Sequence, residues 1–410
     1  MNFLKIDDFN VSGKTILVRV DLNSSLNENK EPQDNIKIKY NSITIKQLSD
    51  LGAKVVVMSH QGRAGDDDLI SMEKHAKLLS KHTEKEIKYI DDIFGTYAKN
   101  SIKSMKNGDI ILLENVRFNA EENLLKENQH KTHLVSQLSP LLDYYVNDAF
   151  AVNHRTNASL IGFPEVLPSF AGRILQRELE VLTKIMNNPK RPSVLLLGGA
   201  KTNDSIKVIK QMLFSNAADI VLTSGLVSLL FLVADGVNIG NATHNILIKK
   251  SNKDIKLAKK ILEKFKNKIL MPLDFAICVD NKRIELPISN LPIDYPILDI
   301  GEKTIKKYKD IILNAGNVIA NGPAGVFEKK QFEKGTQELF EAMHKSKAFD
   351  VFGGGHTALA LEKFGLLEKS SHVSTGGGAF ILYISGEKLP GVNALINSAK
   401  KHHRLITRIK

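Results

Sequence analysis

The chain has 410 residues, of which 42% are hydrophobic and 25% are charged. This composition is typical of soluble globular proteins, argues against disorder outside the C-terminal tail, and at this length predicts two domains. Early acidic residues and the lack of an apolar core of signal-peptide length predict a cytoplasmic location. The most apolar segment, 220–237, is interrupted by Thr223, Ser224 and Asp235, which predicts a buried strand, a turn and a buried helix, and no membrane partner.

The formal net charge of +12 raises the question of a nucleic-acid partner, for which clustered cations are typical. Most lysines alternate with acids, as in 253–268, and only 400–410 is a basic run. The pattern therefore favours a solvated lysine-rich surface over a nucleic-acid interface. The single cysteine, Cys278, lies in an apolar run and is predicted to pack in a core.

Short apolar or β-branched runs alternate with segments of helical periodicity from the start of the chain, which predicts an α/β fold with parallel strands. The strands expected in the first half are Thr15–Val20, Ala53–Met58, Asp109–Leu113 and Asp143–Val146. Their nearly continuous apolar character predicts that helices cover both faces of the sheet, which gives three layers as in Rossmann-like domains.

Charged and polar residues follow each of these four strands. They are found in Asp21-Leu22-Asn23, Ser59-His60-Gln61-Gly62-Arg63, Glu114-Asn115-Val116-Arg117 and Asn147-Asp148-Ala149-Phe150, the last leading to His154-Arg155. Ligands of open parallel sheets bind outside the carboxyl ends of the strands, so we expect three arginines and two histidines in one crevice. Three arginines crowded together would be unfavourable without an anion, which predicts an anion site.

Each of these residues also has a structural interpretation. A lone arginine after a strand usually pairs with a carboxylate or with water, and His60 and His154 are equally well explained as turn residues. Asp21 and Asn23 are suitable helix caps, although their position beside the arginines favours binding of a hydroxyl group.

A long helix is predicted over Phe170–Met186, because apolar residues recur at helical spacing and the segment ends before Pro189. The strand and helix alternation resumes with Pro192–Leu197. We therefore place the domain boundary in this helix and expect the fold to consist of two parallel-sheet domains joined by a long hinge helix.

Glycine replaces arginine at the strand ends of the second half. The segments are Gly198-Gly199-Ala200-Lys201, Thr223-Ser224-Gly225, Pro272-Leu273-Asp274, Asp299-Ile300-Gly301, Asn321-Gly322-Pro323-Ala324-Gly325, Gly353-Gly354-Gly355-His356-Thr357 and Ser374-Thr375-Gly376-Gly377-Gly378. Open backbone N–H groups at helix N-termini suit a nucleotide phosphate chain. Neither a P-loop nor a Gly-x-Gly-x-x-Gly fingerprint after the first strand is present. Lys201 lies at the start of a predicted helix, where the helix dipole disfavours a lysine, so we interpret it as a phosphate contact rather than a surface residue. Glu328 is either a ligand-binding acid or a helix-cap residue.

These strand ends together resemble those of the phosphoglycerate kinase family, over nearly the whole chain. The motifs that carry the resemblance are Arg19–Asn23, Ser59–Arg63, Leu113–Phe118, Asn147–Phe150, Gly198–Lys201, Asn321–Glu328, Ser374–Ala379 and Leu389–Val392. The Gly-Gly-Gly-His-Thr sequence is similar to the archaeal branch of that family.

The resemblance implies reversible phosphoryl transfer from 1,3-bisphosphoglycerate to ADP, with Mg²⁺ and with small-molecule substrates only. It implies a phosphoglycerate domain at 1–169, an interdomain helix at 170–187, a nucleotide domain at 188–388 and a C-terminal segment, 389–410, that returns to the first domain.

The resemblance also assigns residues to roles. Substrate binding falls to Asp21, Leu22, Asn23, Lys37, His60, Gln61, Gly62, Arg63, Arg117 and Arg155. Nucleotide binding falls to Gly199, Lys201, Gly225, Asn321, Pro323, Gly325, Glu328, Gly354, Gly355, His356 and Thr357, with Glu328 on the ribose and Thr223–Leu226 near the base. The catalytic set is Lys37, Lys201, Gly355, Gly377 and Gly378.

Three positions depart from the family pattern. Lys37 stands where the family has a catalytic arginine, and a lysine lacks the bidentate fork. Ser205 stands where many members have a lysine, and His356 where many have an aspartate for the magnesium nucleotide. Imidazole is a poor Mg²⁺ ligand, which leaves the metal ligand unknown, with Asp204 as a candidate. The sequence does not decide between a monomer and a homodimer, and it assigns no role to Arg404–Lys410.

Overall fold

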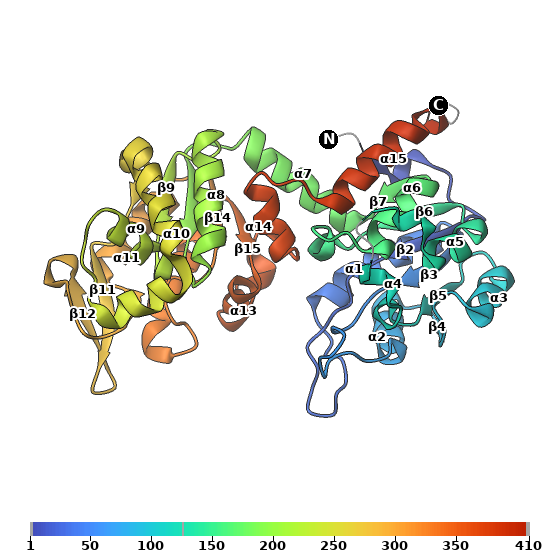
Figure 1. Cartoon of the computed structure of the whole chain (residues 1–410), viewed down its shortest axis with the longest axis horizontal. Coiled ribbons are helices and arrows are strands. Elements are labelled where there is room, and N and C mark those ends of the chain that lie inside the picture. Colours follow the sequence, from blue (N-terminus) through green and yellow to red (C-terminus); the bar gives the residue numbers. More distant parts are fainter. Residues whose placement is uncertain (1–2, 125–126, 407–410) are drawn as a thin grey trace. The chain divides into compact units, whose positions relative to one another are not determined.

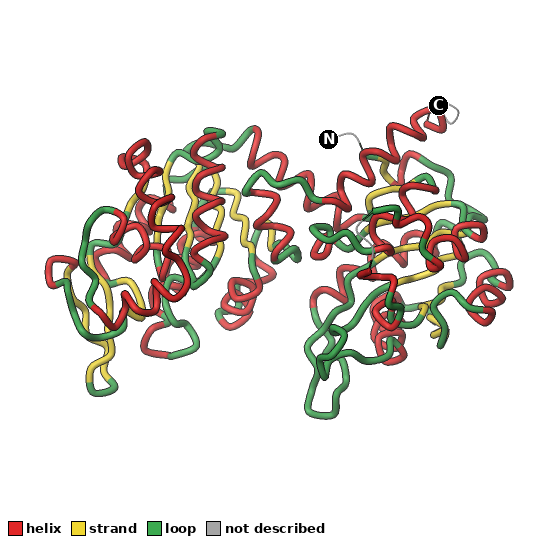
Figure 2. Tube along the Cα trace, viewed as in Figure 1, coloured by secondary structure: helices red, strands yellow, loops and turns green. Residues whose placement is uncertain are grey.

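A computed structural model describes residues 3–124 and 127–406 of the chain. The chain forms two compact units, here called unit 1 (Met1–Glu180 with Lys388–Lys410) and unit 2 (Val181–Glu387). Each unit contains a parallel sheet with helices on both faces (Figures 1 and 2). The predicted α/β class with two parallel sheets is therefore confirmed.

The sheet of unit 1 has seven strands in the order β1-β7-β6-β2-β3-β5-β4, and every neighbouring pair is parallel. Their bounds are Leu4–Lys5 (β1), Thr15–Arg19 (β2), Lys54–Met58 (β3), Ile87–Ile90 (β4), Ile110–Leu113 (β5), Tyr144–Asn147 (β6) and Ser169–Ala171 (β7). The four predicted strands correspond to β2, β3, β5 and β6. Strands β1, β4 and β7 were not predicted, because they are short or lie at the edge of the sheet and lack a long apolar run.

Alternate residues of these strands face two separate cores in unit 1. Ile16 and Val18 of β2 pack with helices α1 (Ile36–Asp50) and α2 (Glu73–Thr83). Leu17 lies in the opposite core, with α3 (Thr96–Ser104), α5 (His133–Leu138) and α6 (Phe163–Val166). Burial of both faces is what the nearly continuous apolar runs predicted.

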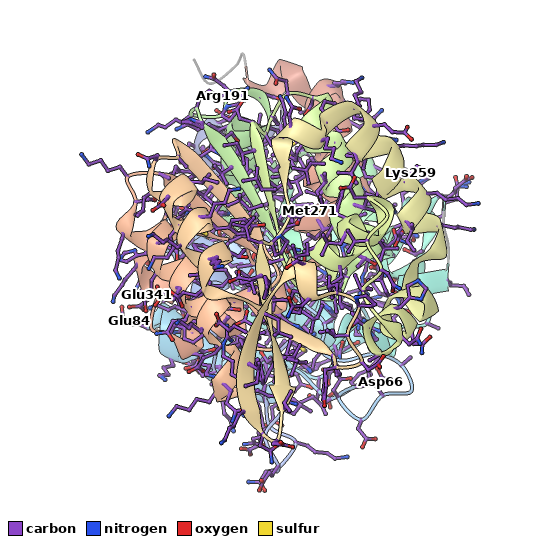
Figure 3. All side chains as sticks on the ribbon, turned by 90° about the vertical axis from the view of Figure 1, so that its left-hand side faces the viewer. Asp66, Glu84, Arg191, Lys259, Met271 and Glu341 are labelled. Carbon is purple, nitrogen blue, oxygen red and sulfur yellow. The ribbon has the colours of Figure 1, made fainter. Side chains whose placement is uncertain are left out.

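The main sheet of unit 2 has six parallel strands in the order β10-β9-β8-β14-β15-β16. The strand bounds are Ser193–Leu197 (β8), Ile220–Thr223 (β9), Ile269–Leu270 (β10), Asn317–Asn321 (β14), Phe349–Gly353 (β15) and His372–Val373 (β16). The helices are α8 (Thr202–Phe214), α9 (Gly225–Ala234), α10 (Asn241–Phe265), α11 (Glu302–Leu313), α12 (Lys334–Lys345), α13 (Gly355–Lys363) and α14 (Gly378–Ile384). Lys259 and Arg191 are exposed side chains of this unit (Figure 3).

A small antiparallel sheet in unit 2 was not predicted. Its strands are β11 (Asp274–Val279), β12 (Lys282–Pro287) and β13 (Ile297–Ile300), in the order β12-β11-β13. Asp280 and Asn281 have φ values of +46° and +58°, as a two-residue hairpin turn requires. The β11–β12 hairpin projects from the rest of the unit (Figure 1). Cys278 is half-buried in β11, so it is less enclosed than the sequence analysis predicted.

Segment 220–237 contains β9 and α9, which confirms the predicted strand, turn and helix. In the part of the chain that the structure describes, no helix is long and apolar enough to cross a membrane. The C-terminal helix α15 (Pro390–Ile406) belongs to unit 1, where Ser398 Oγ donates to the Leu167 carbonyl at 3.1 Å. The last four residues of the basic tail, 407–410, lie outside the described residues.

The long helix between the units is α7 (Arg173–Asn187), which begins in unit 1 and ends in unit 2. The predicted start at Phe170 was wrong, because Ser169–Ala171 form β7 and pair with β6 and β1. The first turn of α7 is capped by the buried Asp148, whose Oδ1 accepts from the backbone N–H groups of Ile174 (2.8 Å) and Leu175 (3.0 Å).

Asp148→Asn is expected to make the protein more stable above pH 6. Burial raises the pKa of Asp148 from 3.8 to about 6 despite the hydrogen bonds that favour its ionised form. The folded state therefore binds more protons at Asp148 than the unfolded chain does between these values, so the contribution of Asp148 to stability is largest below pH 4 and falls as the pH rises through 6. This loss amounts to about 3 kcal/mol, and asparagine keeps the capping oxygen while removing the titration.

Denaturant unfolding of both proteins between pH 4 and pH 8 measures this difference. The two stability curves should diverge as the pH rises and run parallel above pH 7. Parallel curves over the whole range would contradict the prediction.

Candidate functional site

Strands β6, β2, β3 and β5 are neighbours in the sheet of unit 1, so the residues that follow them share one edge. Asp21, His60, Arg117 and Arg155, which follow four different strands, are thus brought together. The last residue of β2, Arg19, also belongs to this group and was missed as a site residue. The burial of Arg19 in the structure identifies it as a site residue. Its side chain is 2% exposed, and arginine is almost never buried without a specific partner.

Lys37 points at Asp21 from the first turn of α1. Asn35 caps this helix by accepting from the Lys37 N–H at 2.9 Å and the Ile38 N–H at 3.4 Å, which fixes the position of Lys37. Lys37 Nζ lies 3.3 Å from Asp21 Oδ2, with side-chain exposures of 34% and 8%. Burial raises the pKa of Asp21, but the charge of Lys37 outweighs it with help from the Asn23 backbone N–H and the charge of Arg19, so the pKa lies below its usual range.

Buried polar groups hold Arg19. Its Nε donates to Ser159 Oγ at 2.9 Å, and Ser159 Oγ in turn donates to the carboxylate of Glu122 at 2.6 Å. Glu122 is 1% exposed, and burial raises its pKa although Arg19 and Ser159 favour the charged form. Glu122 therefore supplies the buried acceptor that orients Ser159 beneath Arg19.

His60 is a neutral hydrogen-bond donor in this arrangement. Burial and then the charge of Arg19 lower the pKa of His60 well below 6.5. Arg19 Nη2 lies 3.3 Å from His60 Nδ1, and because a guanidinium can only donate, Nδ1 must accept. The proton of the neutral ring is then on Nε2.

The remaining arginines lie close enough to influence one another. Burial, followed by the charges of Arg155 and Arg19, lowers the pKa of Arg117 to about 10. Burial and the neighbouring Arg63 lower the pKa of Arg155. Such mutual repulsion is relieved by an anion, so this group, called the basic patch (Arg19, Lys37, Arg63, Arg117 and Arg155), is suited to phosphate or carboxylate.

Other predicted residues of unit 1 shape the loop that carries the patch. Asn23 Oδ1 accepts from the Gly62 N–H at 2.8 Å, and Arg117 Nη1 donates to the Gly62 carbonyl. The side chain of Gln61 is fully buried and accepts from the Ser24 N–H at 2.8 Å, so it bonds within the protein and leaves only its backbone for a ligand. Leu22 is also fully buried, which leaves its backbone as the part able to contact a ligand. Neither Asp21 nor Asn23 caps a helix.

His154 lies next to Arg155 in a pocket of about 290 Å³. Asn123, Thr156 and Asn157 complete its lining. Burial and the Arg155 charge lower the pKa of His154. The pocket extends the polar surface of the basic patch, because Arg155 belongs to both.

The glycine loops of unit 2 interlock through backbone hydrogen bonds. The Gly199 N–H donates to the Pro323 carbonyl at 2.8 Å, and the Gly225 N–H donates to the Ala324 carbonyl at 3.1 Å. The Gly322 N–H donates to Thr357 Oγ1 at 2.8 Å. The loops after β8, β9, β14 and β15 therefore form one surface at the edge of the sheet.

A cavity of about 340 Å³ opens beside these loops, between them and the antiparallel sheet. Its apolar lining includes Leu226, Leu229, Leu232, Phe275, Ile288, Ile297, Leu298 and Val326. Six predicted nucleotide residues also line it, namely Gly199, Gly225, Pro323, Gly325, Glu328 and His356. Lys201, Asn321, Gly354, Gly355 and Thr357 are not part of this lining. Lys201 and Gly354 are the N-caps of α8 and α13, Asn321 ends β14, and Gly355 and Thr357 lie in the first turn of α13.

Two helix N-termini adjoin these loops and face open space. A Cβ added at Gly355, the first residue of α13, or at Gly377, the N-cap of α14, would meet nothing within 4 Å. Gly378 is the first residue of α14, and the exposed Lys201 is the N-cap of α8. Helix N-termini with this access are suited to binding phosphate oxygens.

The described residues include no group of three or more histidine, cysteine, aspartate or glutamate side chains arranged to hold a metal ion. Asp204 is half-buried in the first turn of α8, and His356 is exposed. Mg²⁺ is commonly held by one or two carboxylates together with substrate phosphates and water. The side chains present fit that mode and do not form a closed protein site.

Comparisons with known proteins agree with the geometry. The family model described as phosphoglycerate kinase matches residues 6–387. The phosphoglycerate kinase of Methanothermus fervidus is 47% identical over 408 residues, covering 98% of this chain and 99% of the relative. That of Methanococcus maripaludis is 46% identical over 411 residues, covering 98% and 99%. The crystal structure of phosphoglycerate kinase from Pyrococcus horikoshii has a TM-score of 0.88 at 40% identity and covers 97% of this chain and 99% of its own.

Proposed function

Because the chain belongs to the phosphoglycerate kinase family, we propose that unit 1 holds the phosphoglycerate and that unit 2 holds the nucleotide. The enzyme is a phosphotransferase with a carboxyl group as acceptor. It transfers a phosphoryl group reversibly from 1,3-bisphosphoglycerate to ADP, giving 3-phosphoglycerate and ATP. These small molecules are its substrates.

The basic patch is the observation that supports the phosphoglycerate assignment. Arg63, Arg117 and Arg155 bind the phosphate and carboxylate oxygens, since guanidinium groups match both in geometry and charge. His60 donates a hydrogen bond to the substrate from Nε2. Asp21 and Asn23 bind the hydroxyl group of the phosphoglycerate, the carboxylate as an acceptor and the amide as an acceptor or a donor. Gln61, Gly62 and Leu22 contribute backbone groups and hold the loop.

The apolar cavity supports the nucleotide assignment. The base lies between Leu226 of α9 and the wall formed by β13, Glu328 contacts the ribose, and Pro323 and Gly325 shape the edge. The phosphates extend along the loops that carry Gly199, Gly225, Asn321 and Gly354, toward Lys201 and the N-terminus of α13. His356 contributes through its backbone.

Catalysis follows from positioning and charge stabilisation, because a loose phosphoryl-transfer transition state spreads negative charge over three equatorial oxygens. Lys37, Lys201 and the N–H groups of Gly355, Gly377 and Gly378 stabilise this charge. In-line transfer requires the two ligands to approach each other during turnover, and α7 is the proposed hinge for that motion.

Mg²⁺ accompanies the nucleotide in this proposal and neutralises charge on the phosphates. Phosphate oxygens and water hold it, with Asp204 as the protein carboxylate. The cytoplasmic location and the lack of a nucleic-acid partner remain predictions from the sequence, which leaves both a monomer and a homodimer open.

A coupled assay tests the function directly. Purified protein with 1,3-bisphosphoglycerate, ADP and Mg²⁺ should form ATP, and omission of Mg²⁺ should abolish turnover. Ligand binding without turnover above background would contradict catalysis and would indicate a relative that kept the pockets but lost the chemistry.

Lys37→Arg is expected to raise kcat by about threefold, with the KM for phosphoglycerate changed less than about twofold. Lys37 offers one point charge beside Asp21, whereas an arginine fork can bond Asp21 and the transferring group at once. Steady-state kinetics measure the change, and Lys39→Arg, at an exposed position of the same helix, is the control. Marked slowing would show that the site has adapted around lysine.

A further inference from the structure

Arg283 ties the β11–β12 hairpin to the structure around the cavity of unit 2. Its Nη1 donates to Asp299 Oδ2 at 2.8 Å and to the Gln331 carbonyl at 3.1 Å. Its Nη2 donates to the Ile300 carbonyl at 2.8 Å. One side chain therefore links β12, β13 and the 3₁₀ turn Lys330–Phe332, which follows the loop that carries Glu328.

This ion pair is enclosed. The side chain of Arg283 is 15% exposed and that of Asp299 is 0% exposed. Asp299 Oδ2 also accepts from the Gly335 N–H at 3.0 Å, and Oδ1 accepts from the Ile300 N–H at 2.9 Å. Because a buried pair with this many bonds fixes its surroundings, displacement of Arg283 would move both chain segments that it joins.

Both segments form the cavity. Asp299 and its neighbours Leu298 and Ile300 on β13 line one wall. A Cβ added at Gly325 would lie 2.4 Å from Asp299 Oδ1, and the Val326 N–H donates to the Leu298 carbonyl at 2.8 Å, so the loop that carries Gly325 packs directly against β13. The position of the Gly325–Glu328 loop relative to β13 thus depends on where Asp299 is held.

We propose that Arg283 is a positioning residue for nucleotide binding, which holds β13 and the Gly325–Glu328 loop at the spacing that the base and ribose require. This inference rests on the proposed nucleotide role of the cavity. Arg283 is not among the residues that line the cavity, so it acts through Asp299 and the backbone. A lysine cannot replace it fully, because one ammonium group lacks the fork that reaches four acceptors, namely Glu285, Asp299 and the carbonyls of Ile300 and Gln331.

Arg283→Met tests the inference in the direction that uses ATP and 3-phosphoglycerate. The KM for ATP should rise about tenfold, while the KM for 3-phosphoglycerate changes less than about twofold. Arg283→Lys should give an intermediate rise in the KM for ATP. An unchanged KM for ATP, whatever happens to Tm, would overturn the proposal.

Arg191→Met is the matched control. Arg191 also pairs with an aspartate, Asp219, at 2.6 Å and donates to the Asn216 carbonyl at 2.6 Å in the same unit. Its side chain is 42% exposed, and neither partner lines the cavity. This variant should leave both KM values within about twofold of the unmodified enzyme, and an equal rise in its KM for ATP would overturn the specific role of Arg283.

A double variant separates the effect of the lost Arg283 hydrogen bonds from the effect of leaving the buried Asp299 carboxylate unpaired. In Arg283→Met with Asp299→Asn, the fully buried carboxylate that paired with Arg283 is also removed, and the other carboxylate paired with Arg283, that of Glu285, is 32% exposed, so Tm should recover relative to Arg283→Met. The KM for ATP should stay raised, because the three-way link is still missing. Recovery of the KM together with Tm would show that the charge alone mattered and would overturn the proposal.

Leu226→Trp separates this inference from the function on which it rests. The larger side chain fills part of the cavity and should raise the KM for ATP. A rise with Leu226→Trp but not with Arg283→Met would retain the cavity as the nucleotide site and reject the role of Arg283. If neither variant changes the KM for ATP, both assignments are wrong.

Discussion

Arg155→Met is expected to reduce kcat/KM for 3-phosphoglycerate by about 100-fold, which corresponds to about 2.7 kcal/mol of lost transition-state binding. Arg155 is half-buried, and burial with the neighbouring Arg63 lowers its pKa, so the free enzyme keeps this guanidinium close to another cation. Asp21 and Glu122 compensate that unfavourable arrangement only in part, and a bound anion compensates it further. Methionine retains the apolar stem but loses the charge and the fork.

The same variant should be at least as stable as the unmodified protein, because removal of one cation lowers the repulsion within the basic patch. Steady-state kinetics and thermal unfolding together measure the two effects. Lys14→Met is the control, since Lys14 pairs with Asp143 at 3.2 Å on the surface of the same unit and lies outside the patch. A loss of stability with unchanged kinetics would mean that Arg155 is structural.

Gly354→Ala is expected to raise the KM for ATP by about tenfold or more without changing the KM for 3-phosphoglycerate. Gly354 has φ of +95°, and an added Cβ would lie 2.7 Å from Asn321 Oδ1. The methyl group must therefore displace either the loop before α13 or Asn321 at the end of β14. Both belong to the surface that we assign to the nucleotide phosphates.

Gly236→Ala separates this effect from backbone strain. Gly236 has φ of +93°, but a Cβ there would meet nothing within 4 Å. Both variants should lose about 1 kcal/mol of stability through the strained backbone, and only Gly354→Ala should change the KM for ATP. Equal KM values in the two variants would show that the loop before α13 does not contact the nucleotide.

The sequence predicted the parts of the molecule that local patterns determine. Continuous apolar runs identified β2, β3, β5 and β6 and the burial of both sheet faces, because side-chain alternation and strand length are properties of a few consecutive residues. The residues after these strands were predicted to lie together, since carboxyl ends of parallel strands share one edge. The same pattern carried the resemblance to the family.

Other features depend on partners that lie far apart in the chain. In the sequence, Arg19 is simply a charged residue within a predicted strand. Only the fold places Ser159, 140 positions later, where its hydroxyl group can accept from the buried guanidinium. The start of α7 was misplaced because Phe170 fits a helix locally, whereas pairing with β6 and β1 makes it a strand. Competition between local propensity and tertiary pairing decides such boundaries.

By itself, the sequence determined the α/β class, the two sets of strand-end residues and the family, because these depend on periodicity and on short motifs. Only the tertiary structure decided that Glu122 and Ser159 hold Arg19, and that an antiparallel sheet closes the cavity with Asp299 packed against Gly325. The physical reason is that burial of charge requires specific distant partners, whose positions follow from strand order and packing rather than from neighbouring residues.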